Sequence, residues 1–253
     1  MNRKILLFIF LSFFITKIAA QENSLPYAKL TAAAEYGYNY TYENYGAVQA
    51  YLKFPLKTYF SADCGIKAVT ANIYALTAVL RTTFPTKRDG EWQLENIYLY
   101  RAVVRNQLSD FSAGLRGGYL RNHFEADFGF YVRFIGDLKP DEMLTQKRYI
   151  VEMFNLMYNV EGRLKKDDAR WNIGLRISNY DDFQIERAMS PIFALKARFS
   201  PNKENQKFYL WAEIALKPAG ALHLASNFYD FSSRVGICYS FPMKNISTTK
   251  SQK

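Results

Sequence analysis

A short segment near the C-terminus holds the residue types of a hydrolytic site. His223 and Ser226 are three positions apart, and Asp230 follows them in the chain. A serine hydroxyl becomes a nucleophile when a base lies within about 3 Å of it and a third group orients that base. These residues permit hydrolytic chemistry, but an exposed loop histidine beside a serine has the same sequence and is the simpler interpretation.

The cysteines and histidines give no signal for a metal site or a disulfide. The chain has two of each, and none falls into a metal-ligand spacing. Cys64 and Cys238 lie on opposite faces of their predicted strands, so a bond between them would have to cross the wall of a sheet. His123 lies in a predicted turn at the opposite end from His223. We therefore expect no disulfide, no metal site and no cofactor.

Charged residues that alternate with apolar ones are a third source of chemistry. In 124–134 the even positions are apolar, whereas the odd positions include Glu125, Asp127 and Arg133. If such faces line an interior, its basic residues outnumber its acidic ones. Guanidinium groups bind carboxylate and phosphate through paired hydrogen bonds, so one interpretation is an arginine-lined passage for anions. The other is a closed interior in which arginines and carboxylates pair with each other, and the sequence leaves both open.

The charged residues on this predicted inner face divide into a basic and an acidic group. Its bases are Lys53, Lys67, Arg81, Arg101, Arg105, Arg116, Arg133, Arg163, Arg176, Lys196, Arg198 and Arg234. Its acids are Glu35, Asp63, Glu95, Glu125, Asp127, Glu161 and Glu213. The leading candidates to line a pore are Lys67, Arg101, Arg105, Arg116, Arg133, Arg163, Arg176, Arg234, Glu125 and Asp127.

Strict alternation of apolar and polar residues predicts that β-strands position these side chains. No segment after residue 20 sustains the spacing of apolar residues, every three or four positions, that an amphipathic helix requires. Polar links such as 87–90 are typical of turns. About twelve strands are expected, with ten or fourteen as alternatives. Their predicted ranges are 30–42, 47–54, 59–69, 73–85, 91–105, 110–119, 124–136, 150–164, 169–179, 191–199, 207–217 and 230–241.

The N-terminus has the three regions of a secretory signal peptide. Arg3 and Lys4 precede an apolar stretch at 5–15, and the small pair Ala19 and Ala20 precedes Gln21. We expect cleavage after Ala20, a single β domain over 21–241 and a polar tail over 242–253. Removing the three basic residues of the leader leaves 30 basic against 23 acidic residues, a balance that favours anionic surroundings such as lipopolysaccharide phosphates or acidic solutes.

The last predicted strand resembles the assembly signal of Gram-negative outer-membrane β-barrels. That signal has a polar residue, a glycine and two aromatic residues in fixed places, which Arg234, Gly236, Tyr239 and Phe241 fill in order. The resemblance implies a single antiparallel up-and-down barrel in the outer membrane, with lipid, lipopolysaccharide and the barrel-assembly machinery as partners. Here, unlike in the commonest version, a tail follows Phe241. No particular barrel subfamily is recognised.

Two further features favour a membrane barrel over a soluble β-sandwich, which remains the alternative fold. The chain has 19 Tyr, 20 Phe and 3 Trp, a content that suits the aromatic girdles of a membrane barrel. The longest links, 137–149, 180–190 and 218–229, all fall on the outside if the chain starts in the periplasm.

Three functions stay open for such a barrel. The first is a porin-like, narrow channel for small anionic solutes. The second is a non-conducting structural or adhesive protein whose outer links contact a partner. The third is an enzyme at the membrane rim, because some outer-membrane barrels resemble lipases. The sequence gives no indication of nucleic-acid binding and does not determine the oligomeric state.

Overall fold

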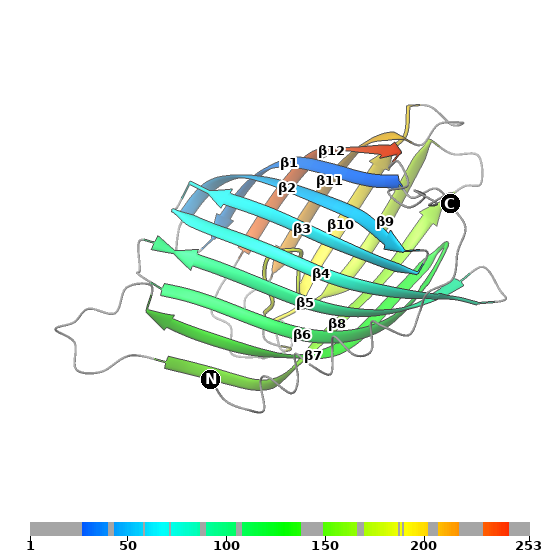
Figure 1. The fold of residues 1–253 in the computed structure, drawn as a ribbon. Helices are drawn as coiled ribbons and strands as arrows, with labels where there is room; N and C mark the ends of the chain where they lie inside the picture. The colour runs from blue at the N-terminus through cyan, green and yellow to red at the C-terminus, as the bar shows by residue number, and fades with distance from the viewer. Residues whose placement is uncertain are drawn as a thin grey trace, which may run out of the picture.

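The twelve described strands form one closed barrel in which every strand is antiparallel to its neighbours (Figure 1). This computed structural model describes residues 27–39, 43–57, 59–70, 72–86, 90–104, 108–137, 149–165, 170–186, 188, 190–201, 207–217 and 230–242. The strands are β1 (Tyr27–Asn39), β2 (Glu43–Lys57), β3 (Phe60–Val69), β4 (Ile73–Pro85), β5 (Gly90–Val103), β6 (Leu108–Arg121), β7 (Phe124–Asp137), β8 (Tyr149–Lys165), β9 (Trp171–Ser178), β10 (Ile192–Phe199), β11 (Phe208–Lys217) and β12 (Asp230–Pro242).

Each strand pairs with the next along the chain, and β1 pairs with β12 to close the ring. The predicted class, an all-β up-and-down barrel of about twelve strands, is therefore confirmed. We call the end where β1 begins and β12 ends the terminal end, and the opposite end the loop end. The strands that flank 138–148, 179–191 and 218–229 end and begin at the loop end. Among the described residues, no helix is long and apolar enough to cross a membrane.

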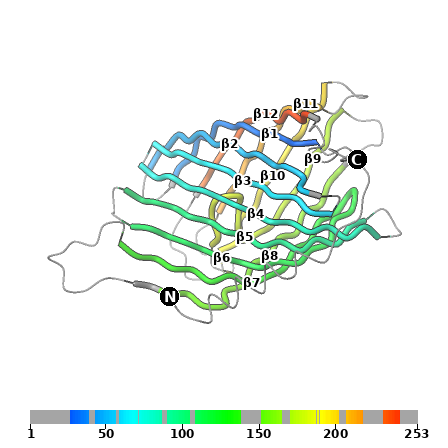
Figure 2. The backbone as a smooth tube through the Cα atoms, in the orientation of Figure 1, coloured from blue at the N-terminus to red at the C-terminus, as the bar shows by residue number. Residues whose placement is uncertain are grey.

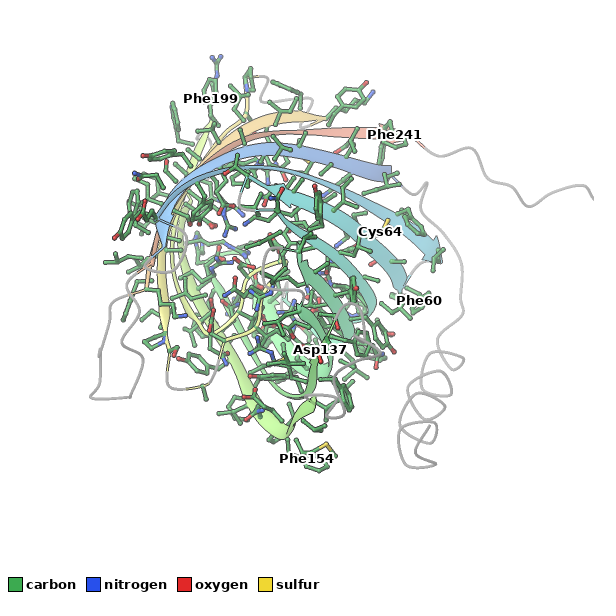
Figure 3. All side chains as sticks on the ribbon, turned by 90° about the vertical axis from the view of Figure 1, so that its left-hand side faces the viewer. Phe60, Cys64, Asp137, Phe154, Phe199 and Phe241 are labelled. Carbon is green, nitrogen blue, oxygen red and sulfur yellow. The ribbon has the colours of Figure 1, made fainter. Side chains whose placement is uncertain are left out.

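The alternation of side chains decides which face of each strand points outward. On β9, Trp171, Ile173 and Leu175 are exposed on the outer face, whereas Gly174 is buried and faces the lumen. The outer face is apolar on the other strands too, as the exposed side chains around the ring show (Figure 3). A surface of this kind is stable against hydrocarbon but not against water.

Aromatic pairs mark the outer face near the terminal end. The rings of Trp171 and Phe199 lie 4.6 Å apart, and those of Trp92 and Tyr119 lie 5.0 Å apart. All four side chains come from the strand halves nearest the chain termini. Their position matches one of the two aromatic girdles that membrane barrels carry at the boundary between lipid and water.

Most strand bounds fall within about three residues of the predicted ranges, and two strands contain irregularities that the alternation did not predict. β2 was predicted to span 47–54 but runs from Glu43 to Lys57, passing Pro55 at an irregularity in its pairing with β3. On β8, a bulge opposite 131–133 adds a residue to the strand, and Phe154 in this bulge adopts a positive φ of 56°. The bulge shifts the alternation, so Glu152 faces the lumen beside Arg133 although simple parity with Leu156 would place it outside.

The link between β9 and β10 folds into the barrel. We call residues 179–191 the luminal loop; positions 187 and 189 lie outside the described residues. Figures 1 and 2 show its described part inside the ring of strands. It forms a narrow hairpin, with a bridge between Tyr180 and Ile185 and a hydrogen bond from the Asp181 amide to the Gln184 carbonyl, 2.8 Å. The sequence predicted that this link lies at the same end as the other two long links, in agreement with the strand order, but it did not predict that the link folds into the lumen.

Candidate functional site

An apolar cluster fixes the luminal loop against the inner wall. Tyr180 and Ile185 of the loop pack with Ile97, Tyr131 and Met157 of the barrel, and all five are buried. The inward residues of most strands are polar, so these apolar ones form a local patch that matches the loop. Burying this apolar surface stabilises the loop in its inward position.

A second contact joins the loop to β2. The rings of Phe183 and Tyr51 lie 4.8 Å apart, and Phe183 is buried. The Tyr51 ring has room because Gly65 of the neighbouring strand has no side chain; a Cβ there would fall 2.5 Å from the ring. A glycine on β3 thus makes space for the aromatic contact that holds the tip of the loop.

Tyr180 also takes part in a polar contact across the lumen. Its hydroxyl donates a hydrogen bond to Asp127, 3.0 Å, and the Arg116 guanidinium lies over its ring, 4.5 Å from the centroid. Asn159 donates a second hydrogen bond to Asp127, 2.9 Å. Glu95 bonds to Arg116 on the other side. The ring is therefore held on its face by a cation and at its edge by a carboxylate.

Arg234 is the centre of the largest ion-pair group. Its guanidinium donates to Asp181 of the luminal loop at 2.7 Å and pairs with Glu35 at 3.0 Å and Glu213 at 3.4 Å. Burial alone would raise the pKa of the Asp181 carboxyl, but Arg234 and then Lys67 lower it below its ordinary value. Protonation of Asp181 therefore does not break the ion pair between the loop and the last strand near neutral pH.

Most of the charges predicted to line a pore are paired with each other. Lys67 pairs with Glu35, Arg101 and Arg133 share Asp110, Arg116 pairs with Glu95, Arg163 pairs with Glu125 and Glu161, Arg176 pairs with Glu213, and Asp127 accepts from Asn159 and Tyr180. Arg105 lies outside the described residues. The structure thus brings the described members of this set into one lumen, and in its middle section the pairing favours the closed interior over the free arginine lining.

Two small cavities remain beside the luminal loop. One, of about 50 Å³, lies next to Arg234, and the other, of about 90 Å³, lies next to Arg116. Both are lined in part by Asp181. Spaces of this size hold a few water molecules. Neither cavity is large enough for a metabolite, so neither offers a passage beside the described part of the loop.

The lumen towards the terminal end has a different character. Lys29, Lys53, Lys196 and Arg198 face inward there, and within the described part of the chain none of them forms a salt bridge. Lys29 and Lys196 are exposed although they face inward. Side chains that point into a barrel are exposed only where water enters, so the lumen is open at the terminal end. We call this part of the lumen, which Lys29, Lys53, Lys196 and Arg198 line, the basic vestibule.

Aromatic rings on β11 hold two of these cations. The Lys196 ammonium lies 5.1 Å from the centroid of Trp211, and the Arg198 guanidinium lies 3.7 Å from that of Tyr209. Gly236 lies directly across from Trp211, and a Cβ there would fall 2.6 Å from its ring. Sequence reading identified the two cations but missed the rings, because the polarity of a face does not show which cation lacks an acidic partner.

The four residues of the predicted assembly signal divide between the two faces of β12. Arg234 and Gly236 face the lumen, and Tyr239 and Phe241 face outward. This is the arrangement that the alternation predicts. Cys64 is exposed on the outer face and Cys238 is buried on the inner face, in agreement with their predicted parity, and both thiols are free.

The proposed hydrolytic residues cannot be placed. His223, Ser226 and the Asp230 side chain lie outside the described residues. His123 is exposed in the turn between β6 and β7, where its ring nitrogen contacts the Arg163 carbonyl at 3.2 Å. That turn is at the terminal end, opposite the link that carries His223.

The comparisons with known proteins concern the fold. No family model matches the sequence, and no curated protein matches it. Among solved structures, the NanC porin is similar over 83% of this chain and 100% of its own, with 8% identity and a TM-score of 0.51. The KdgM porin covers 83% and 99% at 12% identity and a TM-score of 0.48. Outer membrane phospholipase A from Escherichia coli covers 83% and 89% at 10% identity and a TM-score of 0.49.

The closed antiparallel ring agrees with the fold of the NanC porin. The outer face of this chain is apolar and its lumen is charged. An apolar belt on a closed barrel is the form in which β-strands cross a membrane, because every backbone group is paired within the ring. The chain is thus a twelve-stranded outer-membrane β-barrel of porin-like fold.

Proposed function

We propose that this barrel is a narrow channel for small anionic solutes, closed by its luminal loop in the state described here. The observation that carries this proposal is the contrast within the lumen. Cations in the middle are neutralised by carboxylates, whereas Lys29, Lys53, Lys196 and Arg198 in the vestibule are not. An unneutralised basic vestibule raises the local concentration of anions and repels cations.

The luminal loop is held in the lumen by side-chain contacts that can break without unfolding the barrel. The loop is held by one apolar cluster and by ion pairs, Asp181 with Arg234 and Glu186 with Lys217 at 3.0 Å. It is not a strand of the wall, so its displacement leaves the barrel intact. A displaced loop would connect the vestibule to the loop end.

Planar-bilayer recording tests the proposal with two variants. The first replaces 181–188 with a short Gly-Ser linker, which removes the obstruction while all twelve strands remain. We expect rare or small openings from the native protein and steady conductance from the shortened one, with a reversal potential on the anion side. Adding Lys196→Gln and Arg198→Gln to the shortened barrel should move the reversal potential toward that of a non-selective pore.

A non-conducting structural role is the second candidate, and the paired lumen favours it. It predicts that the shortened barrel, shown to be folded by its heat-dependent mobility in gels, remains silent. That result would overturn the channel. A shortened barrel that conducts without ion preference would keep the channel and remove the anion specificity.

The proposal includes export and membrane partners. The N-terminal leader directs the chain out of the cytoplasm, the apolar outer face contacts outer-membrane lipid and lipopolysaccharide, and β12 presents the assembly signal to the barrel-assembly machinery. Replacing Tyr239 and Phe241 with Ser should reduce the amount of folded barrel recovered from outer membranes. A matched replacement of Tyr36 and Tyr38 on β1 should reduce it less.

A further inference from the structure

One strand of the barrel wall has an unpaired edge beside the luminal loop. β8 runs from Tyr149 to Lys165, but its pairing with β9 covers only Asn159–Lys165, opposite 172–178. Among the described residues, 149–157 pair on the other side with β7 alone. The wall is therefore incomplete at the point where β9 ends and the chain turns inward.

Asn179, the first residue of the luminal loop, occupies the place of the next ladder bonds. Its amide still donates to the Tyr158 carbonyl, 3.2 Å, but its own carbonyl has turned to accept from Glu186, 2.7 Å. Its side-chain oxygen accepts from the Tyr158 amide, and its side-chain nitrogen donates to the Leu156 carbonyl, both 2.8 Å. One carboxamide thus takes the bonds that the backbone of a longer β9 would make.

We propose that the luminal loop has a second position, in which 179–191 extend β9 and β10 and pair with the free edge of β8. The existing register predicts the new pairs. Ser178 lies opposite Asn159, so Tyr180 would lie opposite Met157, and Asp181 opposite Leu156. Ser178 also lies opposite Ile192, so the two arms of the loop would continue the β9–β10 hairpin.

The two positions exchange one set of contacts for another. The inward loop has the apolar cluster and the Asp181–Arg234 pair. The extended loop gains ladder bonds for the β8 edge, whose backbone groups need partners in a membrane. In that register Phe183 would share the outward parity of Ile173, Leu175 and Ile177. Asp181 would take the same parity opposite Leu156, at the cost of its pair with Arg234, and Ile185 would fall in the turn of the hairpin. The extended position completes the wall and vacates the lumen.

Residue Asn179 acts as a positioning residue in this exchange. Its carboxamide satisfies Tyr158 and Leu156 only while the loop is inward. Asn179→Ala would leave both backbone groups without partners in the inward position but would not affect a backbone ladder. The substitution should therefore shift the population toward the extended position.

Cysteine pairs distinguish the two positions without measuring conduction. In a Cys64→Ser, Cys238→Ser background, Tyr51→Cys with Phe183→Cys reports the inward position through a short bifunctional thiol cross-linker, which spans the space that the two rings fill. Leu156→Cys with Asp181→Cys reports the extended one. In the inward position Asp181 bonds to β12, whereas Leu156 belongs to the wall on β8, so a bond between them requires the loop to move. Val160→Cys with Asp181→Cys is the matched control, displaced along the same strand.

We expect the cross-linker to join 51 with 183 in most molecules, and mild oxidation to join 156 with 181 in a smaller fraction and not to join 160 with 181. Asn179→Ala should increase the 156–181 yield severalfold and reduce the 51–183 yield. Absence of the 156–181 bond in both backgrounds, in folded protein that forms the 51–183 cross-link, would overturn the inference. Equal yields for 156–181 and 160–181 would overturn the proposed register.

The consequence for transport rests on the proposed function, and the two fail in different ways. A barrel locked through 156 and 181 that stays silent in a bilayer would refute the channel but leave the movement of the loop established. A shortened barrel that conducts, combined with no 156–181 bond, would keep the channel and refute this route of opening.

Discussion

The guanidinium carbon of Arg116 lies 4.5 Å from the centroid of the Tyr180 ring, and this contact joins a strand of the wall to the loop that closes the lumen. The cation is fixed from behind by Glu95, and the tyrosine hydroxyl bonds to Asp127. Neither residue can shift alone, because each has a second partner on the barrel. The position of the loop is thus coupled to the charge pairing of the wall.

Tyr180→Phe should weaken the barrel slightly and Tyr180→Ala should weaken it strongly. The phenylalanine keeps the ring on Arg116 but loses one hydrogen bond, a cost of about 1 kcal/mol. The alanine also removes a buried ring from the apolar cluster, a change that costs about 3–5 kcal/mol in cores. Chemical unfolding of the detergent-solubilised protein measures both. Equal effects of the two substitutions would contradict the packing role of the ring.

Glu95→Gln should destabilise the barrel more than any exposed acid does. Glu95 is buried and bonds to both Arg81 and Arg116. Its replacement by an uncharged glutamine removes the carboxylate that balances the positive charge of both guanidinium groups. Removing one member of a buried ionic group costs about 3–5 kcal/mol. Glu43→Gln, at an exposed position on β2, is the control and should change the free energy of unfolding by less than about 0.5 kcal/mol. Similar values for the two variants would show that the interior network is dispensable.

Gly236→Ala should disturb Trp211, whereas Gly162→Ala should not disturb its surroundings. A Cβ at Gly236 would fall 2.6 Å from the Trp211 ring and 2.7 Å from the Ala32 carbonyl, whereas one at Gly162 would meet nothing within 4 Å. Tryptophan emission, recorded with Trp92 and Trp171 replaced by Phe, reports the shift directly. An unchanged spectrum in Gly236→Ala would mean that the ring does not occupy the space beside Gly236.

The same single-tryptophan protein tests whether the vestibule attracts anions. Trp211 faces the lumen beside Lys196, so iodide should quench its emission more efficiently than neutral acrylamide does, relative to free tryptophan. Lys196→Gln with Arg198→Gln should abolish the preference for iodide and leave acrylamide quenching similar. High salt should weaken the preference for iodide in the protein that keeps Lys196 and Arg198.

Thiol labelling in membranes tests the assignment of the two faces. Cys64 is exposed on the outer face and Cys238 is buried in the lumen. A lipid-soluble maleimide should therefore modify Cys64, and a charged, membrane-impermeant one should modify neither residue in native membranes. Cys64→Ser should lose the label and Cys238→Ser should keep it. Rapid reaction of Cys64 with the charged reagent would place this face in water.

The strands were predictable because a barrel in a membrane sorts its side chains by face. Ile173 and Leu175 alternate with Gly174 and Arg176, and this simple rule gave the class, the strand order and the inward residues. It failed at β8, where a bulge inside an apolar run reverses the alternation and brings Glu152 inward. Nothing local in the sequence signals that reversal, because the bulge follows from pairing with β7.

The luminal loop could not be predicted for a related reason. Tyr180, Phe183 and Ile185 form a short apolar series among charged residues, as many surface links do. Their burial arises from contacts with β2, β5, β7 and β8, which are distant in sequence. The charges of the site were found from the sequence, but their pairing depends on which strands face each other across the lumen.

The partners of Arg234 have a consequence for the order of assembly. Glu35 is on the first strand, Glu213 on the eleventh, Asp181 on the loop, and Arg234 itself on the last strand. These groups meet only when β1 and β12 join, so the arginine acquires its full set of partners in the step that completes the ring. The ion pair that joins the luminal loop to the last strand therefore acquires its complete set of neighbours in the same step that seals the wall.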